Sequence, residues 1–331
     1  MAKADSRRVT GADVARASGF SRQLVGFVLN NTPGQSIPEV TREKVLRAAD
    51  QLGYVPHGPA QALRRGRGRT VLLALPDIPQ GPTMGDVVAS IADELAANGL
   101  TLVTYFPGSD RRSPRDVAAA LAPIVVVGIA RFTEAEVAIF EASGAAVVIP
   151  RPGTQEADSL EAAGRVLTAI QVDYLADRGH RHIAFAQPLD ERAAYLADSR
   201  YDGAREAAKR RGLPAVTRGM VDQSGAQSAL REWRDREHPV TGVACFNDDV
   251  AFAVLAAARS AGLRIPDELA VIGAEDIPVA RFAEPPMTTI AVDGTHVGVH
   301  LARTIIELLA DRAPALPSFL EAIRLVVRSS A

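Results

Sequence analysis

The N-terminal stretch that decides the fold of the head is Thr10-Gly-Ala-Asp-Val-Ala-Arg-Ala-Ser-Gly-Phe-Ser-Arg-Gln-Leu-Val-Gly-Phe-Val-Leu-Asn30. It predicts two short helices, over 11–18 and 22–29. Thr10 is followed three residues later by Asp13, as in a capping box. Gly19 supplies the left-handed residue that commonly ends a helix, and Ser21 is a favourable N-cap for the second helix.

Apolar residues recur at helical spacing through this stretch and through a third predicted helix, at about 39–52. The residues expected to face inward are Val14, Ala15, Leu24, Val25, Val28, Val45, Leu46, Ala49 and Leu52. Two short helices joined by a Gly-containing turn form a helix-turn-helix, whose second helix enters the major groove of DNA. The sequence therefore predicts an all-α, DNA-binding head.

The charge distribution agrees with this prediction. Residues 1–69 carry 12 Lys and Arg against 5 Asp and Glu, whereas the whole 331-residue chain carries 37 against 39. A basic head on an acidic body indicates that the head meets a polyanion and that the body does something else. Taken by itself, the charge fits a solvated basic face equally well.

Composition excludes several other classes of protein. The single cysteine, Cys245, excludes an intrachain disulfide framework and a Cys-based zinc finger. No apolar run approaches the ~18–20 residues of a membrane helix, and residues 1–8 lack the apolar segment of a signal peptide. We therefore expect a soluble, cytoplasmic protein associated with the nucleoid and without a membrane partner.

Beyond residue 70, apolar runs alternate with helical patterns in two series. The first has predicted strands at 71–76, 100–106, 124–129 and 145–149, with helices at 85–98, 113–121 and 133–143. The second has strands at 182–186, 217–221, 240–246 and 269–272, with helices at 159–178, 198–211, 224–236 and 247–261. This order predicts two α/β lobes, each a doubly wound parallel sheet with helices on both faces. A helix at 294–310 and a last strand near 320–328 follow.

Four segments of the head resemble the lactose/galactose repressor family (LacI/GalR). They are Asp-Val-Ala-Arg-Ala-Ser-Gly-Phe-Ser at 13–21, Val-Leu-Asn at 28–30, Thr-Arg-Glu-Lys-Val at 41–45 and Leu-Gly-Tyr-Val-Pro at 52–56. The resemblance implies a helix-turn-helix domain over 1–56 and a hinge helix or linker over 57–69. It also implies a periplasmic-binding-protein-like body of two discontinuous lobes, 70–158 with 293–315 and 159–292 with 316–331.

The resemblance also implies which head residues contact DNA. Arg22 and Gln23 lie where family members place side chains on base edges, and Arg pairs with guanine and Gln with adenine. Phe27 stands where many members have a polar or basic side chain; it can contact a thymine methyl group but cannot recognise guanine. Ser21 and the adjoining backbone N–H groups suit a phosphate. Thr10, Asn30 and Thr32 also suit phosphates, although each is equally an ordinary capping or loop residue.

The hinge segment carries a further implication. Leu63 lies where the family inserts a leucine into the minor groove at a central C-G step, which unstacks the step and kinks the duplex. Ala60 and Arg64 flank it as DNA contacts. Gly58 and Pro59 make the segment a poor helix in the absence of DNA. The alternative is that Leu63 packs against its own domain.

In the body, the resemblance assigns effector contacts to three motifs and one loop. Arg200 begins Arg-Tyr-Asp-Gly, Asn247 lies in Phe-Asn-Asp, and Glu275 is the first acid of Gly-Ala-Glu-Asp-Ile. Asp77 begins the loop after the first strand, which is short and lacks aromatic residues, so we expect an effector that is smaller or less polar than a sugar, or none. The alternative is that Asn247 and Asp248 cap a helix, Glu275 pairs with Arg200, and nothing binds.

No motif for an enzyme or a cofactor is present: the sequence has no Gly-x-Ser-x-Gly elbow, P-loop or Gly-x-Gly-x-x-Gly after a strand. His296 and His300, four apart on a predicted helix, have the spacing of a metal-binding pair, but packing or surface roles are more ordinary. Cys245 follows an apolar run and is expected to be a buried small hydrophobe. We therefore expect neither catalysis nor a cofactor.

Together these observations predict a sequence-specific transcriptional repressor that binds a near-palindromic, double-stranded operator as a homodimer. A small-molecule effector between the lobes would modulate it. Two alternatives stay open. One is a regulator without a metabolite effector, or controlled by a protein partner. The other is a small-solute-binding protein, although that class predicts an export signal and no basic head.

Overall fold

The computed structural model describes residues 9–30, 32, 34–54, 68–75, 81–107, 113–129, 132–152, 155–221, 225–312 and 319–331. The chain forms two compact units, residues 1–68 and 69–331. Four residues predicted to contact DNA or an effector lie outside the described residues: Ala60, Leu63, Arg64 and Asp77.

In the described residues, the head contains the three predicted helices, α1 (Gly11–Ser18), α2 (Arg22–Leu29) and α3 (Glu39–Gln51). The Asp13 carboxylate accepts hydrogen bonds from the backbone N–H and the hydroxyl of Thr10, at 2.9 and 2.6 Å. Gly19, with φ of 75°, ends α1 as expected. A small core joins the three helices; its buried members are Val14, Ala15, Val25, Val28, Val45, Ala48 and Ala49.

Two residues expected in this core are not buried. Leu46 is 45% exposed and Leu52 is 37% exposed, while Ala48 is buried instead. The inward face of α3 is set by Val45, Ala48 and Ala49, and Leu46 lies about 100° around the helix from Val45. Leu52 follows the last residue of α3, beyond the turn that packs on α1.

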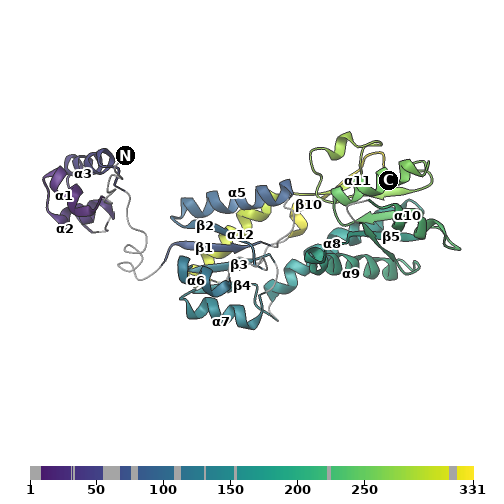
Figure 1. Cartoon of the computed structure of the whole chain (residues 1–331), viewed down its shortest axis with the longest axis horizontal. Coiled ribbons are helices and arrows are strands. Elements are labelled where there is room, and N and C mark those ends of the chain that lie inside the picture. Colours follow the sequence, from purple (N-terminus) through teal and green to yellow (C-terminus); the bar gives the residue numbers. More distant parts are fainter. Residues whose placement is uncertain are drawn as a thin grey trace, which may run out of the picture. The chain divides into compact units, whose positions relative to one another are not determined.

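The first lobe is built on a parallel sheet of order β2-β1-β3-β4. Its strands are β1 (Thr70–Ala74), β2 (Thr101–Tyr105), β3 (Val125–Gly128) and β4 (Val147–Ile149), and its helices include α5 (Pro82–Ala97), α6 (Pro114–Leu121) and α7 (Glu134–Ala142). Alternate residues of β1 face opposite layers: Val71 and Leu73 pack in a cluster with α5, whereas Leu72 packs with α6 and α7. Figure 1 shows the two layers on either side of the sheet.

Helix α5 begins three residues earlier than expected. Gly81 is its N-cap and Pro82 its first residue, a position where proline costs no hydrogen bond because the first N–H groups of a helix have no partner within it. The apolar periodicity that guided the prediction starts only later in the helix, at Val87. The earlier start brings Gly81 to the beginning of a 16-residue helix.

The second lobe repeats this plan with a parallel sheet of order β6-β5-β7-β8. Its strands are β5 (Ile183–Pro188), β6 (Thr217–Val221), β7 (Gly242–Cys245) and β8 (Ala270–Ile272). The helices α8 (Gln155–Asp177) and α9 (Ala194–Arg210, preceded by η1, Glu191–Ala193) pack together, as do α10 (Gln227–Arg234) and α11 (Asp248–Ser260). One core runs through the lobe and contains the buried Trp233, Phe185 and Cys245.

Two strands connect the lobes. After η2 (Ala280–Phe282), β9 (Thr289–Val292) runs beside the second sheet and leads into α12 (Gly294–Leu309), which packs against α5 of the first lobe. After η3 (Phe319–Ala322), β10 (Ile323–Val326) returns antiparallel to β9. The C-terminus then joins the second lobe, where the Val271 N–H donates to the Ser330 carbonyl at 2.7 Å. The predicted fold class is confirmed, and the lobe boundaries at 158, 292 and 315 stay predictions.

The packing of α12 on α5 yields a test of stability. A Cβ added at Gly298 would lie 2.5 Å from the Val87 carbonyl oxygen. Gly298→Ala should therefore destabilise the chain by about 1–3 kcal/mol through overpacking, although alanine favours helix. Urea denaturation measures the change.

Gly85→Ala is the matched control, because Gly85 is exposed in α5 and a Cβ there meets nothing within 4 Å. This substitution should raise stability by about 0.5–1 kcal/mol. A gain for both variants would contradict the close packing of α12 on α5.

Candidate DNA-reading helix and effector site

The residues expected on base edges are exposed at the start of α2. The Ser21 hydroxyl oxygen accepts the Leu24 N–H at 3.2 Å and caps the helix, as predicted. Arg22 and Gln23 follow and are exposed; within the described part of the head, neither side chain forms a hydrogen bond or an ion pair. No acidic residue lies on α2. The first turn therefore presents a cation, an amide and N–H groups that have no partner within the helix.

Phe27 lies one turn after Gln23 and therefore shares its helix face. Phe27 is half-buried, but it is not among the residues of the head core. An apolar side chain in this position can contact a thymine methyl group. The spacing thus places an amide and an aromatic ring along one line of the recognition helix.

The three residues expected on phosphates also have structural roles. The Asn30 amide donates to the Gly26 carbonyl at 2.6 Å, and the Thr32 backbone N–H donates to the Phe27 carbonyl at 3.0 Å. The only hydroxyl proton of Thr10 goes to Asp13, so a phosphate would have to compete with that carboxylate. Phosphate contacts at these positions stay predictions.

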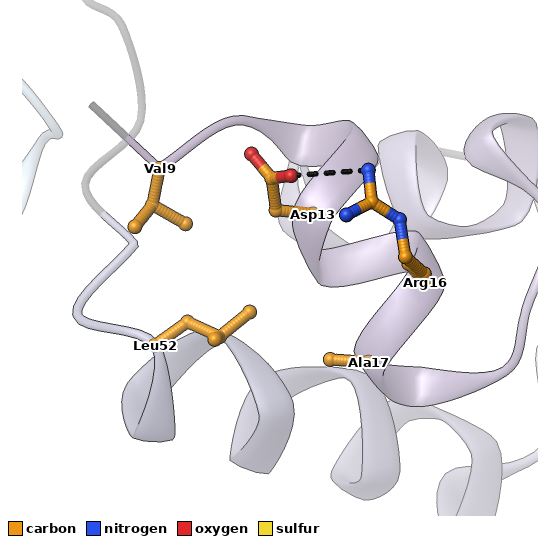
Figure 2. Close-up of a pocket in the computed structure, with 5 residues that line it drawn as sticks. All are labelled: Val9, Asp13, Arg16, Ala17 and Leu52. Carbon is orange, nitrogen blue, oxygen red and sulfur yellow. Dashed lines mark ion pairs between the residues drawn. The ribbon is translucent and has the colours of Figure 1, made fainter. Parts of the chain in front are cut away.

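A separate pocket of about 430 Å³ lies between α1 and the end of α3 (Figure 2). It is lined by Val9, Asp13, Arg16, Ala17 and Leu52. Leu52, expected in the core, contributes instead to this pocket, beside an ion pair between Asp13 and Arg16 at 3.2 Å. None of the residues predicted to contact bases lines it.

In the second lobe, the three predicted effector residues gather near the carboxyl ends of β7 and β8. Arg200 projects from α9 with 14% of its side chain exposed. Its guanidinium donates to the Phe246 carbonyl and lies over the Phe246 ring, 4.2 Å from the centroid. Its Nη2 is 4.0 Å from Glu275 Oε1. Burial lowers the pKa of Arg200, and the Glu275 charge opposes this.

Glu275 lies in the turn after β8 with φ of 103°, in the left-handed region. Its backbone N–H donates to the Ile290 carbonyl at 2.6 Å, which ties the turn to β9. The side chain is 21% exposed. Burial raises the pKa of its carboxyl, and the neighbouring Arg200 charge lowers it. The Glu275 carboxylate and the Arg200 guanidinium are thus held together near the carboxyl ends of β7 and β8.

Asn247 has the capping role that the alternative interpretation gave it. Its side-chain oxygen accepts the Val250 N–H at 3.0 Å and caps α11. The amide group keeps two N–H donors for a ligand. Arg200 contacts Glu275 and the backbone, and the oxygen of Asn247 caps α11, so the predicted pairing of Glu275 with Arg200 and the predicted cap are both present.

Asp248 is a key residue that sequence reasoning treated only as a helix cap. It is fully buried, and its carboxylate accepts the Thr289 hydroxyl at 2.6 Å and the Ile277 N–H at 2.8 Å. A Cβ at Gly273 would collide with this carboxylate. Burial raises the pKa of Asp248 to about 7 against the effect of its hydrogen bonds, and the charges of Glu275 and Asp276 raise it further. The sequence feature that could have identified Asp248 is its position directly after Asn247, which caps α11.

Two further contacts fix the same region. The buried Gln171 amide of α8 donates to the Cys245 and Gly273 carbonyls at 3.0 and 2.7 Å, which joins the ends of β7 and β8. Asp276 pairs with Arg328 at 2.7 Å. The turn that carries Glu275 is thus held from α8, α11, β9 and the C-terminal segment.

The remaining chemistry-bearing residues have ordinary surroundings. The rings of His296 and His300 stack with centroids 6.2 Å apart. Among the described residues, no group of three or more His, Cys, Asp or Glu could hold a metal ion. Cys245 is buried as expected, and burial raises the pKa of its thiol. No helix in the described part of the chain is long and apolar enough to cross a membrane.

Comparisons with known proteins agree with this architecture. Residues 11–57 match the model of bacterial regulatory proteins of the lacI family, and residues 172–331 match a periplasmic binding protein-like domain. The transcriptional repressor PurR of Vibrio vulnificus is 28% identical, with 91% of this chain and 92% of that protein covered. The repressor CytR of Escherichia coli is 24% identical, with 99% and 98% covered.

Solved structures show the same fold over nearly the whole chain. The lac repressor dimer bound to operator and the anti-inducer ONPF has a TM-score of 0.75 at 21% identity, covering 98% of this chain and 99% of that one. The CelR–cellobiose complex has a TM-score of 0.61 at 25% identity, covering 98% and 100%.

A helix-turn-helix head joined to a two-lobed, periplasmic-binding-protein-like body defines a class of DNA-binding transcription regulator. The chain thus carries a head of the lacI family of bacterial regulatory proteins and a periplasmic binding protein-like domain. This family consists of transcriptional regulators, as the sequence resemblance implied.

The buried Asp248 predicts a pH dependence of stability. Its pKa is about 7 in the folded chain, against an ordinary value of 3.8. The folded state therefore binds more protons than the unfolded state between these values, and stability present at low pH is lost as the pH rises toward 7. Asp248→Asn should flatten the decline of Tm with pH between about pH 4 and pH 7.

Asp249→Asn is the control for this comparison, because Asp249 is the exposed neighbour on the same helix. Its melting curve should keep the wild-type dependence on pH. Parallel profiles for wild type and Asp248→Asn would show that Asp248 does not titrate in this range.

Proposed function

We propose that this chain is a transcriptional repressor whose dimer binds a near-palindromic operator, one head on each half-site. The observation that carries the proposal is the exposed Arg22 and Gln23 in the first turn of a capped recognition helix. A two-fold protein dimer matches a two-fold DNA site because each head meets the same sequence. The lacI-family head and the repressors of similar sequence support this function.

The proposed base contacts follow from the chemistry of α2. Arg22 offers a planar fork of N–H donors to guanine, and Gln23 offers a donor and an acceptor to adenine. Phe27 contacts a thymine methyl group on the same helix face. Ser21 and the first N–H groups of α2 hold a phosphate, with Thr10, Asn30 and Thr32 on neighbouring phosphates. Phosphate contacts orient the head, and base contacts give sequence preference.

We further propose that the hinge enters the minor groove, as the family resemblance implies. Leu63 is inserted at a central C-G step, and Ala60 and Arg64 flank it. The cost of unstacking is offset by the added contacts of a bent duplex. A hinge that orders only on DNA would let the state of the body control DNA affinity.

The body is proposed to bind a small effector between the lobes. Arg200, Glu275 and the amide protons of Asn247 supply charge and hydrogen bonds on the second lobe, and the family resemblance adds Asp77, which follows the first strand in the sequence. CelR has been crystallised with cellobiose. The short, aromatic-free loop of this chain favours a smaller or less polar ligand. An effector can shift the equilibrium between two arrangements of the lobes only if it binds one arrangement more tightly than the other.

The protein is proposed to work in the cytoplasm, at the nucleoid, without catalytic activity, a cofactor or a membrane partner. Control by a protein partner, or by no ligand, is the second candidate for the body. It is favoured by the self-satisfied hydrogen bonds of Arg200 and Asn247. The small-solute-binding alternative gives no role to the basic head.

In vitro selection of random duplex DNA by the full-length protein tests the central proposal. We expect a recovered near-palindrome with a central C-G step. Binding that depends on salt and lacks a motif would contradict sequence-specific regulation and leave the head as a general polyanion surface.

Arg22→Ala tests base recognition. The variant should lose about 1–3 kcal/mol of discrimination at one base position in each half-site, because a bidentate contact to guanine is lost. Competition binding with single-base variants of the selected site measures this loss. Arg16→Ala is the control, because Arg16 is an exposed arginine of α1 that pairs with Asp13. Uniform weakening across all sequences would assign Arg22 to the phosphates.

Leu63→Ala tests the wedge. The variant should bend the selected operator less and bind it more weakly, because the leucine no longer supports the unstacked step. Circular-permutation gel shifts or energy transfer between the operator ends measure the bend. An unchanged bend angle would remove Leu63 from the mechanism.

A further inference from the structure

The carboxylate of Glu275 lies close to residues of both lobes of the body. Within the second lobe, its Oε1 is 4.0 Å from Arg200 Nη2. Its Oε2 lies 3.1 Å from the position that a Cβ on Gly81 would occupy. Gly81 is the N-cap of α5 in the first lobe. One side chain therefore lies close to both lobes at the place where an effector is proposed to bind.

The first-lobe side of this contact favours a negative charge. Helix α5 has 16 residues, and its first turn contains no acidic residue. Gly81 gives the helix no side-chain cap. The first N–H groups of a helix have no partner within it, and the aligned peptide dipoles place partial positive charge there. Glu275 thus brings to the start of α5 the carboxylate that α5 does not supply itself.

The second-lobe side fixes where this carboxylate lies. The Glu275 N–H is bonded to the Ile290 carbonyl, and Asp248 accepts the Ile277 N–H from the other end of the turn. Arg200 is itself held by the carbonyl and the ring of Phe246. The turn that carries Glu275 and the Arg200 guanidinium are both anchored in the second lobe. The length of the Glu275 side chain therefore determines whether its carboxylate reaches α5.

We propose that Glu275 is an internal ligand of the cleft: its carboxylate bridges Arg200 and the N-terminus of α5 and holds the lobes closed without an effector. An effector regulates the protein by displacing this carboxylate. The second statement rests on the proposed function, whereas the first concerns the body alone. Gly81 is part of this contact because a glycine has no Cβ and leaves room for the Glu275 carboxylate at the start of α5.

The experiment measures the separation of the lobes in the full-length protein by spin-label distances. Ala138→Cys on α7 and Lys209→Cys on α9 place one label on each lobe at exposed positions. The single native cysteine, Cys245, is buried and remains unlabelled. The measurement needs neither an operator nor an effector, so its failure is distinct from failure of the proposed regulator.

Three variants weaken the contact in different ways. Gly81→Ala places a Cβ against the carboxylate, while its φ of −77° and ψ of 174° suit alanine and preserve the fold. Glu275→Gln removes the charge and keeps the size. Glu275→Asp withdraws the carboxylate by one methylene. Each should shift the distance distribution toward longer separations, with an unchanged circular dichroism spectrum.

Two controls accompany them. Gly85→Ala adds the same methyl group to α5 where nothing lies within 4 Å. Glu237→Gln removes an exposed charge from the second lobe. Both should keep the wild-type distribution. The proposal is overturned if Gly81→Ala and Glu275→Gln leave the distances unchanged, or if the controls shift them equally.

Discussion

The buried carboxylate of Asp248 is the constraint on which the geometry of the body depends. It lies at the start of α11, and its two acceptor bonds reach the turn after β8 and the strand that leaves for the first lobe. A buried carboxylate is tolerated only when it is hydrogen-bonded or protonated. The side chain meets the first condition through Thr289 and Ile277, and its raised pKa brings the second close to neutral pH. The residues predicted to contact an effector and the interlobe connection are therefore fixed by the same group.

Much of the fold followed from local patterns in the sequence. The capping box at Thr10, the glycine stop at Gly19 and the N-cap at Ser21 are contacts between residues close in the chain. The βαβ order is equally local, and β1 shows it clearly because successive residues pack on opposite layers. Errors arose where the outcome depends on tertiary packing: the periodicity of α3 did not reveal that Leu46 lies beside the core.

The candidate site was predictable only in part, for a related reason. The resemblance located Arg200, Asn247 and Glu275, and the structure brings them to one end of the second sheet. It could not reveal that Asp248 holds Thr289, because 41 residues separate the two partners. The approach of Glu275 to Gly81 is likewise a contact between lobes, and no spacing in the sequence reports it. Non-local contacts of this kind determine whether a set of polar residues is open to a ligand.

These contacts place a thermodynamic condition on any effector. A ligand that displaces Glu275 must replace its interactions with Arg200 and with the start of α5, and it must leave the displaced carboxylate solvated or newly paired. Only the binding free energy that remains after these costs changes the populations of the lobe arrangements. On this proposal, an anionic ligand would compete for Arg200 and the start of α5, and it would open the body by displacing the carboxylate. Under the proposal, the charge of an effector therefore determines how well it competes with Glu275 for these positions.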